Sequence, residues 1–357
     1  MEPDIIESGS GYPRFRPRLP HPSRRVIAVT AVAAVAVAVA ICLTVRLRPE
    51  PAGYPIPVAA GQGVQALAVS GNYLYAATDY GGDAPYALAV YDRATGRRIR
   101  QLSVPGMPAA LRVGPGGGVW LSFSAGVWLL SPDLSRRSAS GQMGPPDLLP
   151  TGPDTALLGT QNGLTLLTMP APGAAGRPRA RQPPGTLINV QGTVGELASV
   201  DGSIVAEVTI GDGLNSYFVI AGEPGVSYGG TAYHEAGFIL AEDNGLWVTL
   251  NPYGPGPLVR LDARLDPVTP PAVSGDAELA QSMLIWSDGD TIWDATAAGL
   301  VCFTYRDGRL GPVGTVRLPG HPAALAAAGG TVYVSLADGA IDVTTSLTSH
   351  RIPAACR

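Results

Sequence analysis

Seven polar or aromatic residues stand in or beside turn segments, where side chains can gather around a ligand. Their hydroxyl, carboxylate, amide and imidazole groups can donate or accept hydrogen bonds, and carboxylates and imidazoles can also bind a divalent cation. The sequence therefore predicts a ligand-binding site rather than a particular reaction. The candidate residues are Tyr80, Asp83, Asp212, Asn215, Asn251, Tyr253 and His321.

Catalytic motifs of defined spacing do not occur in the chain. The metalloprotease, nucleophile-elbow, phosphate-loop and dinucleotide-binding patterns find no match. His234 and Glu235 form the best acid–base pair, but one adjacent pair carries little specificity. Residues 287–290 (Ser-Asp-Gly-Asp) lack the later ligands of a calcium loop and are typical of a hairpin turn. We therefore expect no catalytic residue, no bound metal and no cofactor.

A repeat of about 43 residues organises most of the chain. Residues 105–111 (PGMPAAL) and 319–325 (PGHPAAL) are identical at six of seven positions and lie 214 residues apart, which is five such periods. Each copy leads through a glycine-rich turn into a strand-like run. Asp-Gly and Asn-Gly pairs recur, for example at Asp201, and they accept the positive φ that tight hairpins need. Periods of this length are typical of repeat architectures.

Several short strands in each repeat predict an all-β fold, a β-propeller of about seven four-stranded blades over residues 63–357. One blade cannot bury both of its faces, so neighbouring blades must cover them. Residues 186–227 are the least regular, which leaves six or eight blades as alternatives; tandem β-sandwiches are the alternative fold. Aromatic residues of the second strands are expected to pack between blades: Tyr75, Trp120, Trp247, Trp293 and Tyr333.

The candidate site residues fall at one end of the predicted blades. In a propeller, the loops between second and third strands and the loops that lead into each blade meet around one mouth of the central channel. Three of the former loops are long, at 79–85, 210–216 and 251–256, and His321 lies in a loop of the latter kind. A concave mouth lined by polar and aromatic groups is the default binding site.

Residues 329–343 (GGTVYVSLADGAIDV), with the related repeats, resemble the repeat of bacterial YVTN-type and quinoprotein-like β-propellers. The resemblance covers about residues 63–357 and implies an architecture rather than an activity. The chain lacks the vicinal cysteine pair of many quinone-dependent alcohol dehydrogenases. The resemblance therefore implies no particular enzyme.

The run at 26–45 contains twenty residues without a charge, enough to cross roughly 30 Å of hydrocarbon as a helix. Five arginines precede it and two follow it closely, which predicts a cytoplasmic N-terminus and an extracytoplasmic C-terminal domain. A cleaved signal peptide would have a shorter apolar core and a small-residue cleavage site. The predicted organisation is a disordered Arg-rich cytoplasmic head (1–25), one transmembrane helix (26–45), a Pro-rich linker (46–62) and the propeller (63–357).

The formal net charge is −4, and all 24 basic residues are arginine. The absence of lysine is typical of a high-GC bacterial genome, and we expect an actinobacterial source. Residues 26–357 carry 19 arginines and 25 acidic residues, so the outer domain is mildly acidic and nucleic acid is not an expected partner. The arginines at 177–181 are interpreted as part of a solvated loop or an outer strand.

Cys302 and Cys356 lie outside the predicted membrane segment. An even pair in an extracytoplasmic compartment favours a disulfide between them, and two idle thiols are the alternative. Residues 54–58 (YPIPV) are expected to run extended beside the last blade and close the ring. Both features would strengthen the place where a ring opens most easily.

These features favour a non-enzymatic binding or scaffold module, held by a single-pass anchor at the outer face of a bacterial plasma membrane. The expected partner is a protein, peptide or glycan of the cell envelope. The alternative is a propeller enzyme (a lyase, a lactonase or a quinone-dependent enzyme) with a metal or cofactor at the channel mouth. A stoichiometric divalent ion in the purified protein would favour the enzyme.

Overall fold

The chain divides into two compact units, Met1–Pro51 and Ala52–Arg357. All residues that the computed structural model describes lie in the second unit, and its regular structure there is β-strand. No helix in this described part is long and apolar enough to cross a membrane. The described residues are 55–56, 62–80, 86–141, 147–160, 163–181, 192–210, 215–221, 237–242, 245–249, 258–268, 282–288, 291–296, 299–306, 308–311, 313–318, 320–337 and 344–351.

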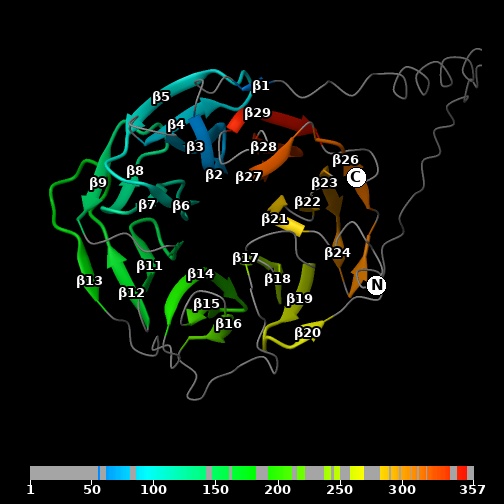
Figure 1. Ribbon diagram of the computed structural model, residues 1–357. Coiled ribbons are helices and arrows are strands. Elements are labelled where there is room, and N and C mark those ends of the chain that lie inside the picture. The colour runs from blue at the N-terminus through cyan, green and yellow to red at the C-terminus, as the bar shows by residue number, and fades with distance from the viewer. Residues whose placement is uncertain are drawn as a thin grey trace, which may run out of the picture. The chain divides into compact units, whose positions relative to one another are not determined.

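Antiparallel sheets follow one another around a central axis and form a β-propeller (Figure 1). Sheets 1 to 3 are β2 (Gln62–Ser70), β3 (Tyr73–Tyr80), β4 (Ala87–Asp92) and β5 (Arg98–Ser103); β6 (Pro108–Val113), β7 (Val119–Phe123), β8 (Gly126–Leu130) and β9 (Arg137–Ser140); and β10 (Leu148–Pro150), β11 (Thr155–Thr160), β12 (Gly163–Thr168) and β13 (Arg179–Arg181). Sheets 4 and 5 are β14 (Thr193–Val200), β15 (Ser203–Ile210) and β16 (Asn215–Ile220); and β17 (Gly237–Glu242), β18 (Gly245–Thr249), β19 (Leu258–Asp262) and β20 (Pro267–Val268). Sheets 6 and 7 are β21 (Ser282–Asp288), β22 (Thr291–Thr296), β23 (Gly299–Phe303) and β26 (Gly314–Val316); and β27 (His321–Ala328), β28 (Thr331–Ala337), β29 (Thr344–Arg351) and β1 (Pro55–Ile56). A separate hairpin joins β24 (Tyr305–Arg306) and β25 (Arg309–Leu310).

Six of these sheets are four-stranded blades among the described residues, so the predicted count of seven four-stranded blades is wrong. Sheet 4 has three strands in the described part and lies in the ring between sheets 3 and 5 (Figure 1). It falls within 186–227, the stretch whose repeat is least regular.

The first strand of each sheet lies beside the axis. β2, β6, β10, β14, β17, β21 and β27 each contact the next first strand, and β27 contacts β2. In six of them, all except β10, the register with the second strand shifts close to the strand's beginning. Such a β-bulge adds an unpaired residue and re-aims a side chain. Residues at four of these bulges line the central channel: Gln65, Ala109, Glu196 and Ala323.

The core consists of apolar clusters between neighbouring sheets of the described ring. Five of the clusters each contain one of the predicted second-strand aromatic residues, at most 2% exposed, so the prediction of packing between blades is confirmed. Leu157 and Val205 belong to the clusters on either side of sheet 4. The Tyr75 hydroxyl also donates to the Pro132 carbonyl at 2.8 Å, which ties sheet 1 to sheet 2.

β1 closes the ring. Pro55 and Ile56 pair with β29, so a strand that precedes sheet 1 in the chain is the outer strand of sheet 7. This confirms the expected closure for Pro55 and Ile56, while residues 54, 57 and 58 lie outside the described residues. Sheets 7 and 1 are also joined through Arg93, whose Nε donates to the Tyr333 hydroxyl at 3.0 Å.

Cys302 lies in β23, where it is fully buried and disulfide-bonded. Its partner lies outside the described residues, where the chain holds Cys42 and Cys356. The pairing of Cys302 with Cys356 therefore stays a prediction. The predicted head (1–25) and transmembrane helix (26–45) also lie outside the described residues.

Candidate functional site

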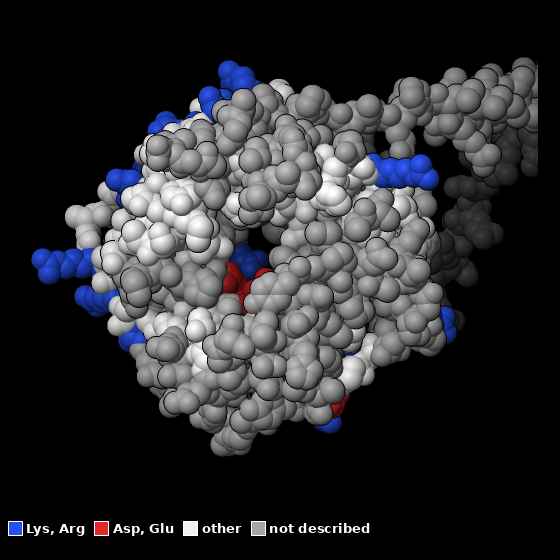
Figure 2. Space-filling model, in the orientation of Figure 1, with Lys and Arg blue, Asp and Glu red and all other residues white. Residues whose placement is uncertain are grey.

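A cavity of about 390 Å³ lies at the axis, between first strands from different sheets. Figure 2 shows the opening, with acidic and basic side chains inside it. Its wall has two chemically different halves. Sheets 2 to 4 supply the charged half, and sheets 6, 7 and 1 supply a half that is mostly apolar but includes Gln65.

Arg112 in β6 is the basic group of the charged half. Its Nε and Nη2 donate to Oδ1 and Oδ2 of Asp147, at 3.3 and 2.9 Å. Two parallel hydrogen bonds of this kind fix the plane of a guanidinium. The Arg112 side chain is 35% exposed, whereas that of Asp147 is 5% exposed. Arg112 is therefore held by a buried partner while part of its guanidinium faces the channel.

The bulge in β14 completes the charged half. The backbone N–H of Leu197 donates to Asp147 Oδ2 at 2.9 Å, so Asp147 joins sheets 2, 3 and 4. Glu196 lines the channel, and its backbone N–H donates to Glu207 Oε2 at 3.3 Å. Because a β-bulge re-aims the chain locally, this one directs two successive N–H groups at two different carboxylates.

Three carboxyl groups, on Asp147, Glu196 and Glu207, accompany one guanidinium. The Asp147 carboxylate, with a smaller contribution from Glu196, raises the pKa of Arg112 above its ordinary value. Arg112 is therefore a cation wherever the protein is folded. The surrounding carboxyl groups disfavour a bare anion beside it. A neutral acceptor, such as a peptide carbonyl, suits this half of the channel better.

The opposite half is mostly apolar and has a fixed shape. Leu67, Leu284, Ile285, Trp286 and Leu325 line it. The Trp286 ring is held in place because its Nε1 donates to the backbone carbonyl of residue 327, at 3.0 Å. A ligand in the channel therefore meets a hydrogen-bond donor on one side and an apolar surface on the other.

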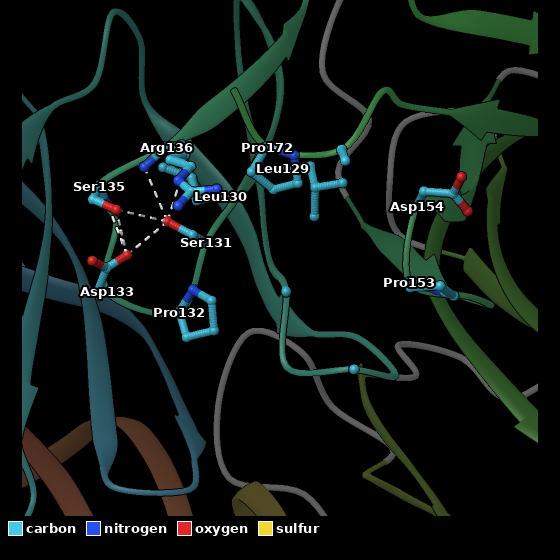
Figure 3. A pocket seen from close by; sticks show the side chains of 13 residues that line it. Leu129, Leu130, Ser131, Pro132, Asp133, Ser135, Arg136, Pro153, Asp154 and Pro172 are labelled. Carbon is cyan, nitrogen blue, oxygen red and sulfur yellow. Dashed lines mark hydrogen bonds between the residues drawn. The ribbon is translucent and has the colours of Figure 1, made fainter. Parts of the chain in front are cut away.

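A second cavity, of about 560 Å³, lies between sheets 2 and 3 and is lined largely by turns (Figure 3). Asp133 and Asp154 supply its carboxyl groups, and Asp133 accepts hydrogen bonds from the hydroxyls of Ser135 and Ser131, both at 2.7 Å. These hydrogen bonds lower the pKa of Asp133 to about 2, and the bond from Ser135 contributes most. The Asp133 carboxylate is committed to its own turn, whereas Arg112 of the channel is fixed by Asp147 and partly exposed, so we place the candidate site in the central channel.

Three of the seven predicted site residues lie in described strands. Tyr80 ends β3, Asn215 begins β16 and His321 begins β27, which places them at the face of the ring where first strands begin. His321 is exposed there. Within the described part, no group of three or more His, Cys, Asp or Glu side chains could hold a metal ion. The remaining candidates lie outside the described residues, so convergence of the seven stays a prediction: Asp83, Asp212, Asn251 and Tyr253.

Sequence reasoning missed Arg112, although the repeat contains a signal for it. After the shared PGxPAAL motif, the next residue is Arg112 in one copy and Ala326 in the other. Arg112 carries a guanidinium where Ala326 carries a methyl group. Because this position lies on a strand beside the axis, the difference indicates a charged group inside the channel. Asp147 has no comparable signal, because the sequence before it does not align with the motif.

No protein-family model matches the chain, and no curated protein shows significant similarity to it. Solved structures do match. A chain in the crystal structure of the mitotic checkpoint complex gives a TM-score of 0.57 at 12% identity, covering 85% of this chain and 96% of that one. The β-propeller domain of Cps50 (Swd1) from Myceliophteria thermophila gives 0.57 at 10% identity, covering 84% and 100%. Hydrazine synthase from Kuenenia stuttgartiensis gives 0.54 at 12% identity, covering 84% and 98%.

Identities this low show a shared fold alone. The chain is a β-propeller, and the activities of these structures do not transfer to it.

Proposed function

We propose that the chain is a membrane-tethered binding module whose central channel takes a peptide segment of a cell-envelope partner. The observation that carries the proposal is the Arg112 guanidinium, held by Asp147 and partly exposed opposite an apolar wall. Its N–H groups can donate to a peptide carbonyl while an apolar side chain of the same segment packs against Leu284 and Trp286. A cavity of about 390 Å³ suits a loop or a chain end rather than a folded domain.

In this proposal, residues 26–45 anchor the chain in a bacterial plasma membrane as one transmembrane helix, with the head inside and the propeller outside. The uncharged length of the run and the arginines before it support the anchor. The pairing of β1 with β29 supports the tether, because it joins a segment within the predicted linker (46–62) to the closed ring. The propeller fold provides a rigid platform for binding. The resemblance to YVTN-type repeats is consistent with this role.

Peptides selected from a displayed random library on the full chain, in detergent micelles, test this proposal. We expect the selected peptides to bind Arg112→Gln at least about tenfold more weakly, because a hydrogen bond to a charged group contributes about 1.5–3 kcal/mol. Arg264→Gln is the matched control, since Arg264 is exposed in a turn away from the channel. Equal affinity for the wild-type and Arg112→Gln proteins, measured where both are folded, would contradict the proposal.

A further inference from the structure

The outer strands of sheets 1 to 3 carry basic side chains and no acidic ones. β5, β9 and β13 contain five arginines and neither Asp nor Glu. Three more arginines stand in the adjoining turns, and all eight are exposed. Figure 2 shows basic side chains projecting along this edge, where Figure 1 places β5, β9 and β13. We call this surface the basic rim; it consists of Arg97, Arg98, Arg100, Arg136, Arg137, Arg177, Arg179 and Arg181.

Little of the charge of the basic rim is neutralised locally, although Asp92 lies close enough to Arg97 for a Coulombic interaction. Within the described part of the chain, none of its arginines forms an ion pair. The guanidinium of Arg137 lies 4.7 Å from the centre of the Trp128 ring, which leaves its charge in place. Asp92 and Asp133, in the turns before β5 and β9, accept hydrogen bonds from hydroxyls of their own turns. The rim therefore presents net positive charge on a domain that is acidic as a whole.

An exposed apolar side chain lies within the basic rim. Arg98 and Arg100 pair with Tyr91 and Val90, two adjacent residues, so Ile99 is the extra residue of a β-bulge. Ile99 is 43% exposed and is one of two large hydrophobic residues exposed in the described part. An apolar tip between guanidinium groups matches the boundary of a phospholipid bilayer, where acyl chains lie below phosphate groups.

The basic rim begins next to the place where the chain joins the ring. β1 is the outer strand of sheet 7, and sheet 7 packs against sheet 1, which carries β5. Residues 46–54 separate β1 from the apolar run at 26–45. Nine residues span at most about 30 Å. In the proposed function, a linker of this length limits the distance between β1 and the membrane to about 30 Å.

We propose that the basic rim is a second membrane contact, which places the edge of the propeller on an anionic phospholipid surface. The proposal rests on the tether of the proposed function. Each basic residue near such a surface strengthens partitioning about fivefold. In this orientation the propeller axis lies along the membrane, so both mouths of the channel stay open to a partner.

Sedimentation of residues 52–357 with phospholipid vesicles tests the proposal. This unit is compact by itself and contains every described strand, so it can be studied without the anchor. We expect binding to vesicles that contain phosphatidylglycerol, weakening as salt rises, and none to pure phosphatidylcholine. The triple variant Arg100→Gln, Arg179→Gln, Arg181→Gln should lose about 100-fold in partitioning.

The matched control is Arg264→Gln, Arg309→Gln, Arg317→Gln, which removes three exposed arginines of sheets 5 to 7 and their connections. We expect less than about a threefold loss, because these residues are not on the basic rim. Ile99→Ser should weaken binding severalfold without changing its salt dependence, since it removes an apolar contact only.

Equal losses in the two triple variants would overturn the proposal, because net charge rather than the basic rim would then govern binding. Failure to bind anionic vesicles would also overturn it. Tighter binding to dextran sulfate than to vesicles would also overturn the proposal, because it would show that the basic rim binds a soluble polyanion rather than a membrane. Alkaline extraction of membranes containing the full chain tests the tether separately. An extraction-resistant chain without rim binding would contradict this inference alone.

Discussion

Leu134 and Leu265 adopt a backbone conformation that leucine usually avoids. Their φ angles are 57° and 67°, in the left-handed region, where Cβ crowds the carbonyl oxygen. Both stand in turns between third and fourth strands, and both side chains are buried in clusters between sheets. Gly96, with φ 67°, takes the corresponding place in sheet 1. Core burial therefore offsets the conformational cost at the two leucines.

Replacement of Leu134 by glycine tests this balance. Glycine relieves roughly 1–2 kcal/mol of conformational cost, whereas loss of a buried leucine side chain costs roughly 2–5 kcal/mol. We expect Leu134→Gly to lower the free energy of unfolding by about 2 kcal/mol in urea denaturation. Asp201→Gly is the control, because Asp201 has φ 47° but is exposed, and its effect should stay below about 0.5 kcal/mol. A more stable Leu134→Gly protein would contradict this account.

Asp133 gives a prediction about pH. Hydrogen bonds from Ser135 and Ser131 lower its pKa from 3.8 to about 2, so its contribution to stability is complete above pH 3.8 and is lost as pH falls through about 2. Ser135→Ala should therefore lower the free energy of unfolding at pH 7, and this deficit should shrink below pH 3.8. Urea denaturation at several pH values measures it. The exposed Ser199→Ala is the control, and a deficit independent of pH would count against the assignment.

At the scale of elements, tight hairpins were predictable and bulges were not. Asp201 and Gly202 both have positive φ, at 47° and 77°, as their Asp-Gly sequence predicts. Local residue chemistry decides such turns, and so a single sequence reveals them. The bulges of the first strands arise where strands from several sheets crowd the axis. The bulges at Ala109 and Ala323 share a place in the PGxPAAL motif, but the bulge at Gln65 lies in a segment without that motif.

Gly126, the first residue of β8, lies close to the backbone of the neighbouring strand β9. A Cβ at this position would press against the backbone carbonyl oxygen of Ser140 in β9. We expect Gly126→Ala to lower the free energy of unfolding by at least about 2 kcal/mol, because backbone must move. Gly141→Ala is the matched control, since nothing lies within 4 Å of its added Cβ. Equal stability of the two variants, measured by thermal and urea denaturation, would refute the close contact.

At the scale of the whole molecule, the sequence predicted the closed ring but not the charged residues that line its central channel. The period of the repeat and the second-strand aromatics indicated a propeller, and the position of YPIPV indicated its closure. The number of four-stranded blades was not predictable, because sheet 4 departs from the repeat. The ion pair between Arg112 and Asp147 joins first strands of two sheets. Only the closed ring brings them together.

Ring closure by β1 gives a prediction about truncation. A chain of residues 58–357 lacks β1 and leaves the outer edge of β29 unpaired. We expect it to be less stable than residues 52–357 by about 2 kcal/mol, from the loss of a few hydrogen bonds and their packing. Hydrogen exchange in β29 should accelerate more than exchange in β12, on the far side of the ring (Figure 1). Identical melting temperatures of the two chains would show that β1 does not close the ring.

The most direct test of the central claim, that a peptide segment binds in the channel, is a dissociation constant measured on three full-chain proteins. These are the wild type, Arg112→Gln, and a variant with Asp83→Ala and Tyr253→Ala at the predicted loop site. We predict that a library-selected peptide binds Arg112→Gln at least about tenfold more weakly, at a temperature at which all three proteins are folded. A dissociation constant that rises only in the loop variant would place the site on the loop face and contradict the channel.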